Sequence, residues 1–78
     1  MAAVITKIDP GSPGEKAGLR VGETLISIGG HPIHDVMDYK FYAYDPRLLL
    51  TVEGTEGARR SVSVHKKEGQ DLGLEFET

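Results

Sequence analysis

Cysteine and tryptophan are both absent from this chain of 78 residues. Without cysteine, the chain forms no internal disulfide, offers no thiolate nucleophile and cannot ligate an iron–sulfur or zinc–thiolate cluster. Chemistry that needs a cysteine thiolate is therefore excluded for the chain itself, and we expect no cofactor and no metal in this chain.

Long apolar runs, a leader pattern and a basic patch are also missing. No stretch approaches the ~18 apolar residues of a membrane span, and the N-terminus lacks a signal-peptide pattern. The net charge is −3, and only Arg59-Arg60 and Lys66-Lys67 place basic residues side by side. A nucleic-acid interface would need a basic stripe or patch. We expect a cytoplasmic monomer that binds neither membrane nor nucleic acid.

The length allows one small domain. Hydrophobic residues make up 38% of the chain and charged residues 27%, which is typical of a folded globular protein. A chain this short buries only roughly 60–65% of the surface that its unfolded form exposes. Its core is thin, so a deep enclosed active site is not expected. We predict a single domain over 1–78, taken from the N-terminal end of a longer protein.

Turn and capping residues divide the chain into short strands and two helices. Ser12 can cap a first helix that contains Pro13 in its first turn, and Asp35 can cap a second that ends before Pro46. The second helix should cover 36–44, and the strands 3–8, 24–28, 48–53, 59–66 and 72–77, with a brief extended stretch at 31–33. This order predicts an α+β fold, a small partly open barrel or sandwich of five to six strands capped by two helices.

A long motif in the first half resembles PDZ domains. The stretch Asp9–Glu23 is similar to the family pattern P-G-S-P-A-x-x-A-G-L followed by x-x-G-D, and Ser27–Gly30 is similar to the I-N-G that ends the next strand. Glu23 stands for the usual Asp and Gly29 for the usual Asn. We expect these two changes to loosen side-chain bonding in the two turns without disturbing the hydrophobic pattern.

The resemblance implies a binding module without catalytic machinery. PDZ domains accept an extended peptide or protein segment by β-strand addition between a sheet edge and the second helix. Here the edge would be the strand at 74–77, and the helix that at about 36–44. The implied groove residues are Leu72, Gly73, Leu74, Glu75, Phe76, Val36, Met37, Lys40 and Ala43.

Many members hold a terminal carboxylate on a loop reading G-L-G-F. A similar D-L-G-L lies at Asp71–Leu74, near the end of the chain, so we infer a circular permutation in which 59–66 would come first in the family order. The implied carboxylate-binding residues are Leu72, Gly73, Leu74 and Lys67. Glycine would let a carboxylate approach bare N–H groups that a Cβ would obstruct. Asp71 opposes such a ligand by its charge, and the alternative is a glycine that only starts the strand.

A narrower resemblance concerns the parent protein. The motifs at 38–41 and 71–76 are similar to the N-terminal PDZ-like domain of bacterial iron–sulfur proteins related to radical S-adenosylmethionine enzymes. In those proteins a cysteine-rich region follows. The alternative function is therefore a structural or regulatory appendage of a larger iron–sulfur enzyme, with no free peptide ligand.

Other chemistry has little support in the sequence. His31 and His34 are three residues apart, but Pro32 makes that stretch extended, so a solvated turn is favoured over a metal site. No Gly-x-Ser-x-Gly or phosphate-binding glycine loop occurs. Four aromatic residues crowd one helix, and they cannot all face one core. We expect two or three to pack inward and at least one to line the groove or a contact: Tyr39, Phe41, Tyr42 and Tyr44.

Overall fold

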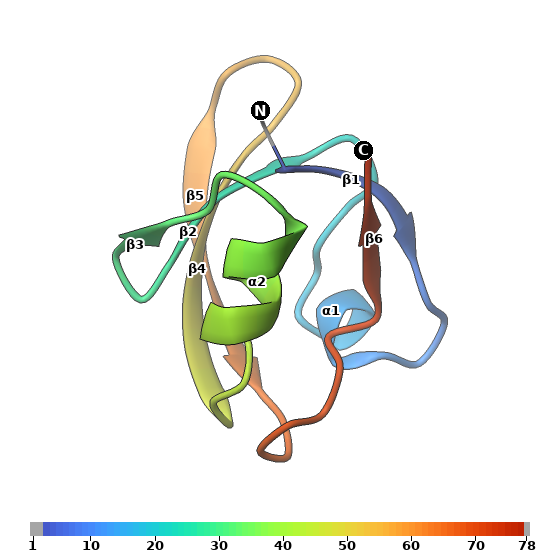
Figure 1. Cartoon of the computed structure of the whole chain (residues 1–78). Coiled ribbons are helices and arrows are strands. Elements are labelled where there is room, and N and C mark those ends of the chain that lie inside the picture. Colours follow the sequence, from blue (N-terminus) through green and yellow to red (C-terminus); the bar gives the residue numbers. More distant parts are fainter. Residues whose placement is uncertain (1–2, 78) are drawn as a thin grey trace.

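The computed structural model describes residues 3–77, which form six strands and two short helices (Figure 1). In chain order the elements are β1 (Ala3–Ile8), α1 (Pro13–Lys16), β2 (Thr24–Ile28), β3 (His31–Pro32), α2 (Val36–Tyr42), β4 (Arg47–Glu53), β5 (Arg59–His65) and β6 (Leu74–Phe76). The predicted elements are all present. The second helix and the last strand are each shorter than predicted.

All strands belong to one open, antiparallel sheet. Its order is β5-β4-β2-β1-β6, with β3 paired to β2. The last strand in the chain, β6, therefore lies at one edge of the sheet beside β1, and Ile8 pairs with Leu74 in the register. The α+β prediction is confirmed. Neither helix in residues 3–77 is long and apolar enough to cross a membrane.

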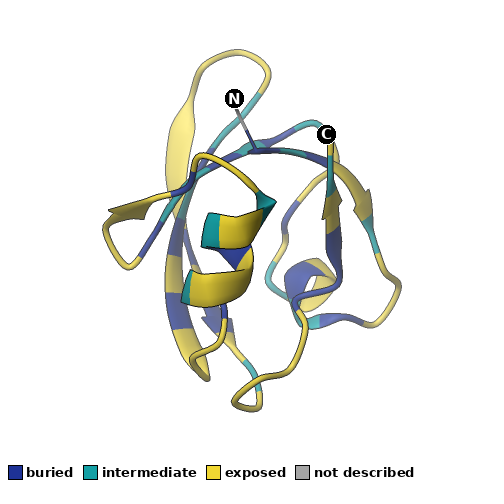
Figure 2. Cartoon of the chain, viewed as in Figure 1, coloured by how far each residue is buried: buried dark blue, intermediate teal, exposed yellow. Residues whose placement is uncertain are grey.

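The core lies between the sheet and the two helices. Along β4, Leu48, Leu50 and Val52 are buried, whereas the residues between them are more exposed, and Figure 2 shows this alternation along the ribbon. Val62 and Val64 alternate with exposed residues on β5 in the same way. Each fully buried Leu or Val contributes about 1.5–3 kcal/mol. This period of two is what places one face of the hairpin in the core.

Side-chain caps fix where both helices begin. Ser12 Oγ accepts a hydrogen bond from the Glu15 N–H at 3.2 Å. The Asp35 carboxylate accepts from the Asp38 N–H at 3.0 Å, and Asp38 in turn accepts from the His34 N–H at 3.0 Å. The Asp35 bond is an N-cap, which satisfies one N–H group that the helix leaves without a partner, and the Asp38 bond ties the helix to the residue before that cap. Both caps were predicted from the sequence.

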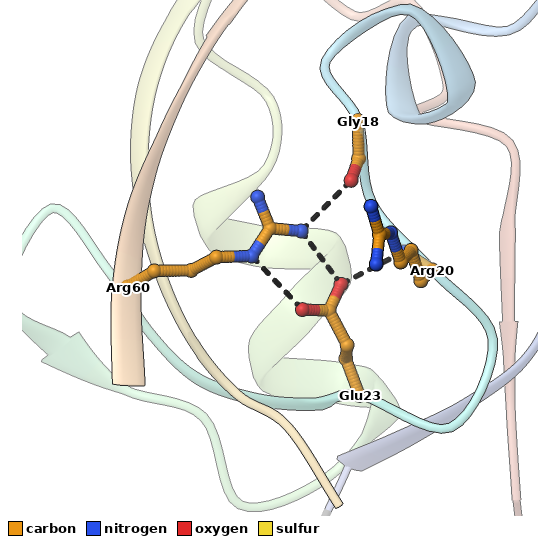
Figure 3. Close-up of polar contacts among 4 residues, drawn as sticks. All are labelled: Gly18, Arg20, Glu23 and Arg60. Atoms are coloured by element: carbon orange, nitrogen blue, oxygen red, sulfur yellow. Dashed lines mark hydrogen bonds and ion pairs between the residues drawn. The ribbon is translucent and has the colours of Figure 1, made fainter. Parts of the chain in front are cut away.

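A buried carboxylate joins the turn before β2 to β5. Glu23 is only 8% exposed, and Arg60 donates to it from Nε at 3.0 Å and from Nη2 at 2.9 Å (Figure 3). Glu23 also accepts from the Arg20 N–H at 2.8 Å, and Arg60 Nη2 donates to the Gly18 carbonyl at 2.8 Å. The expectation that glutamate loosens this turn was wrong, because its longer side chain reaches both a backbone amide and an arginine.

Two glycines hold the start of β6 against α1. The Gly14 N–H donates to the Leu72 carbonyl at 2.9 Å, and a Cβ on Gly14 would stand 2.8 Å from that oxygen. Gly73 has a φ of +82°, and a Cβ there would collide with the Ser12 side chain, 2.7 Å from its Oγ. Glycine at 73 is therefore required by the backbone and by the contact with Ser12. The sequence left two reasons for this glycine open, room for an approaching carboxylate and the start of a strand, and the contact with Ser12 is a further reason that the sequence did not indicate.

We expect Gly73→Ala to lower the free energy of unfolding by about 2–4 kcal/mol, because left-handed strain adds to a steric clash. Gly11→Ala is the matched control, since Gly11 has a φ of +74° with no atom within 4 Å of its Cβ position. It should cost only about 1–2 kcal/mol. Urea unfolding of both variants measures the difference. Equal losses would show that the contact with Ser12 is not tight.

A second expectation concerns the Glu23 carboxylate. Burial acts to raise the pKa of Glu23, but the hydrogen bonds and charge of Arg60, together with the Arg20 backbone, outweigh it and leave that pKa below its usual value. The pair therefore stabilises the fold above the carboxyl pKa of the unfolded chain, and this contribution is lost as the pH falls.

Arg60→Met should accordingly lower the free energy of unfolding by about 1–3 kcal/mol at pH 7 and by much less at pH 3. The control is Arg59→Met on the same strand, because Arg59 pairs at 3.2 Å with the more exposed Glu53. That change should cost no more than about 0.5 kcal/mol. Urea unfolding at both pH values gives the four numbers. An equal effect of the two substitutions at pH 7 would contradict this assignment.

Candidate functional site

A groove of about 440 Å³ runs between α2 and β6. Figure 1 shows the two elements facing each other, with the connection that precedes β6 closing one end. Its lining comes from the helix, from residues 69–72 and from the strand: Val36, Tyr39, Lys40, Ala43, Tyr44, Gly69, Gln70, Asp71, Leu72, Leu74, Glu75 and Phe76. Most of the residues that the sequence predicted for the groove are thus brought together.

The helix contributes one face to the groove. Val36, Lys40 and Ala43 follow at spacings of four and three residues, which places them along one side of an α-helix. Met37 lies outside the lining and is 74% exposed, because one residue turns the helix by about 100°. Met37 therefore does not stand where the sequence analysis placed it. Lys40 combines a groove position with an exposed, charged end.

The strand contributes a free backbone edge. On the side of β1, the Gly73 carbonyl accepts from the Asp9 N–H at 2.8 Å, and the Glu77 N–H donates to the Val4 carbonyl at 2.8 Å. Backbone groups alternate in direction along an antiparallel strand. The carbonyls of Leu74 and Phe76 and the N–H of Phe76 are therefore directed to the other side, towards the groove.

The floor of the groove is aromatic. Tyr39 is buried, and its ring meets that of Phe76 edge to face, with centroids 4.7 Å apart. At the other end Tyr44 is more than half exposed and lines the groove beside Gly69. The Gly69 N–H donates to the Tyr44 carbonyl at 2.8 Å, which ties the loop to the end of the helix. The expectation that some aromatics pack inward while one lines the groove describes this arrangement.

The loop that resembles the carboxylate-binding loop is occupied by its own side chain. Asp71 Oδ1 accepts the Gly73 N–H at 2.9 Å. Leu72 is fully buried and its carbonyl is bonded to α1. Lys67, which the sequence suggested as a positive partner, lies outside the groove lining, and its N–H is bonded to Gln70 Oε1 at 3.0 Å. Lys66 donates from Nζ to the carbonyls of Tyr44 and Lys67.

The hydroxyl of Tyr39 points at the same loop. Within residues 3–77 it is the one buried side-chain oxygen or nitrogen without a well-formed hydrogen bond. Burial raises the pKa of Tyr39, and the Asp71 carboxylate raises it further, whereas the N–H groups of Leu72 and Leu74 act in the opposite direction. The lining at the closed end of the groove therefore contains a buried phenol and an exposed carboxylate.

A second and larger hollow of about 740 Å³ lies on the outer side of α2, bounded by β4 and the turn after β2. The rings of His31 and Tyr42 stack there with centroids 4.4 Å apart, and Phe41 is 75% exposed beside them. His31 thus packs as an aromatic ring. No group of three or more potential metal ligands occurs in the described part of the chain.

The sequence named Tyr44 only as one of four aromatic residues that could line the groove, and it did not point to Gly69 or Gln70. Tyr44 lies just beyond the helix end, and Gly69 and Gln70 belong to the turn before β6, so no helical or strand period points to them. The sequence signal that could have found them is the pair of turns that flank the groove, Asp45-Pro46 and Glu68-Gly69.

The comparison with known families agrees with this geometry. Residues 4–54 match the PDZ domain family, a segment that runs from β1 to the end of β4 and includes α2. No curated protein matches the chain. The matched segment holds the helix side of the groove, while β5, the loop and β6 follow it. Since the match covers well over half of the chain, the protein belongs to the PDZ domain family.

Proposed function

We propose that this domain binds an extended protein segment, which adds as a strand to β6 and lies in the groove against α2. The observation that carries the proposal is the free edge of β6, whose outward backbone groups border a groove lined by the helix. PDZ domains in general bind peptides or protein segments, and addition of a strand to an exposed sheet edge is the mode that this geometry supports.

The backbone alone would give modest affinity. Three outward groups on β6 are available to a partner strand, and each hydrogen bond contributes about 0.5–1.5 kcal/mol net. Side chains entering the groove must add the rest. Val36, Ala43 and Leu74 present apolar surface for one such side chain, and Lys40 presents a charge at the rim. Selection among ligands would therefore come from the helix.

The order of elements supports a permuted PDZ arrangement. β5 is followed by the loop and then by β6, so the strand that the family resemblance puts first occurs here after β4. The hairpin of β4 and β5 is fully paired from Arg47 with His65 to Glu53 with Arg59. The permutation leaves the groove strand at the end of the described residues, beside β1.

The alternative is that a neighbouring segment of a larger iron–sulfur protein fills the groove, so that no free peptide competes. The two possibilities differ in one measurement. Under the first, free peptides bind the isolated domain. Under the second, free peptides do not bind the isolated domain, and the groove is occupied only in the parent protein, by a segment of the same chain.

The test is a titration of the ¹⁵N-labelled domain with a pool of extended peptides, followed by amide shifts. We expect shifts in β6 and along the groove face of α2. Val36→Asp should weaken binding at least tenfold, because it places a charge on apolar lining. Met37→Asp is the matched control on the next residue of the same helical turn, and it should leave affinity unchanged. Equal weakening by both, or shifts confined to the outer face of α2, would contradict the proposed groove.

A further inference from the structure

The closed end of the groove is not a vacant anion site. A carboxylate held by a loop of this kind needs converging N–H groups that have no other acceptor. Here the Gly73 N–H is already bonded to Asp71 Oδ1 at 2.9 Å. The buried Tyr39 hydroxyl belongs to the same lining and has no hydrogen-bond partner among residues 3–77. The loop thus already contains a carboxylate, its own.

The charge at this end also opposes a carboxylate ligand. Asp71 is exposed and borders the groove, so an incoming carboxylate would approach a like charge. Lys66 is close enough to interact with the charge of Asp71, but it does not line the groove, and its ammonium donates to the carbonyls of Tyr44 and Lys67. Opposite charges attract where like charges repel, so the same position favours a cation.

The groove lining extends along the loop to the end of α2. It includes Gly69 and Gln70, which precede Asp71 in the chain, and Tyr44, which follows α2. A ligand that ended at the Gly73 N–H would leave these residues uncovered. A longer chain would meet both Asp71 and Tyr44, because both are exposed and both line the groove. An aromatic face and a carboxylate together form a favourable surrounding for a Lys or Arg side chain.

We infer that the occupant of this groove is an internal segment of a protein chain, not a free C-terminus, and that it places a Lys or Arg side chain between Asp71 and Tyr44. This inference rests on the proposed function, because it specifies which extended segments the same groove accepts. It assigns Asp71 the role of occupying the loop N–H and of selecting a cation in place of a carboxylate.

The experiment uses two displayed libraries of random peptides. In one library the random segment ends in a free carboxylate, and in the other it is flanked on both sides by Gly-Ser linkers. The probe proteins are the unaltered domain, Asp71→Asn and Asp71→Gly. Asn keeps an oxygen that can accept the Gly73 N–H but removes the charge, whereas Gly removes both. Glu68→Gln is the matched control, because Glu68 is an exposed carboxylate in the same loop that does not line the groove.

The unaltered domain should select from the flanked library and enrich Lys or Arg at one fixed position. Synthetic peptides with that residue should bind at least tenfold more tightly than the same peptides with alanine there. Asp71→Asn should remove most of this preference, and Glu68→Gln should not. Asp71→Gly should gain binders from the free-carboxylate library, because it leaves the Gly73 N–H available.

Two failures are distinguishable in this design. If the unaltered domain selects from the free-carboxylate library and amidation of those peptides abolishes binding, this inference is wrong and the proposed groove stands. The same holds if flanked peptides bind without any preference for a cation. If neither library yields peptides that shift the amides of β6, the proposed function fails together with the inference. Amide spectra of each variant establish that it is folded.

Discussion

The arrangement of this domain depends on how the tail is anchored as it returns to the sheet. Gly73 turns the chain with a positive φ directly against Ser12, and the Gly14 N–H holds the Leu72 carbonyl from the other side. These contacts hold the start of β6 against α1, and among the strands that the structure describes β6 pairs with β1 alone. An edge strand that is only three residues long would otherwise have few bonds to keep it in place.

The same anchoring explains why the closed end of the groove is polar yet occupied. Because β6 starts at the surface of α1, Asp71, two residues before Gly73, can place its carboxylate where it accepts the Gly73 N–H. Asp71 thereby satisfies a donor that would otherwise need a ligand, and it brings a negative charge to the groove. A PDZ groove can in this way keep its sheet edge and its helix while a carboxylate of the chain itself occupies the N–H at its closed end and adds a negative charge there.

Much of this fold follows from local rules that the sequence displays. The hairpin strands β4 and β5 and the caps at Ser12 and Asp35 were predicted, because each depends on neighbours in the chain. The groove itself was predictable only through the family resemblance, since its two walls are separated by some thirty residues of chain.

The other features of the groove depend on the directions of side chains on α2 and β6, two elements that are far apart in the sequence. Helical phase excludes Met37 from the groove, although Val36 beside it belongs to the lining. The position of the Tyr39 hydroxyl near the Asp71 loop depends on how the tail packs against α2. The sequence periodicity of a single element does not specify such a long-range contact. Glu23 is a different kind of error. We expected the longer acid to loosen the hydrogen bonding of its turn, but its carboxylate accepts from Arg60 and from a backbone amide.

The central claim is that β6 keeps one side of its backbone unpaired in the free protein. Amide hydrogen exchange measured residue by residue tests it directly. The N–H groups of Glu75 and Glu77, which are directed to β1, should exchange slowly relative to the N–H of Phe76, which is directed to the groove. Protection of Phe76 equal to that of its two neighbours would show that the edge is already paired, and would contradict the account.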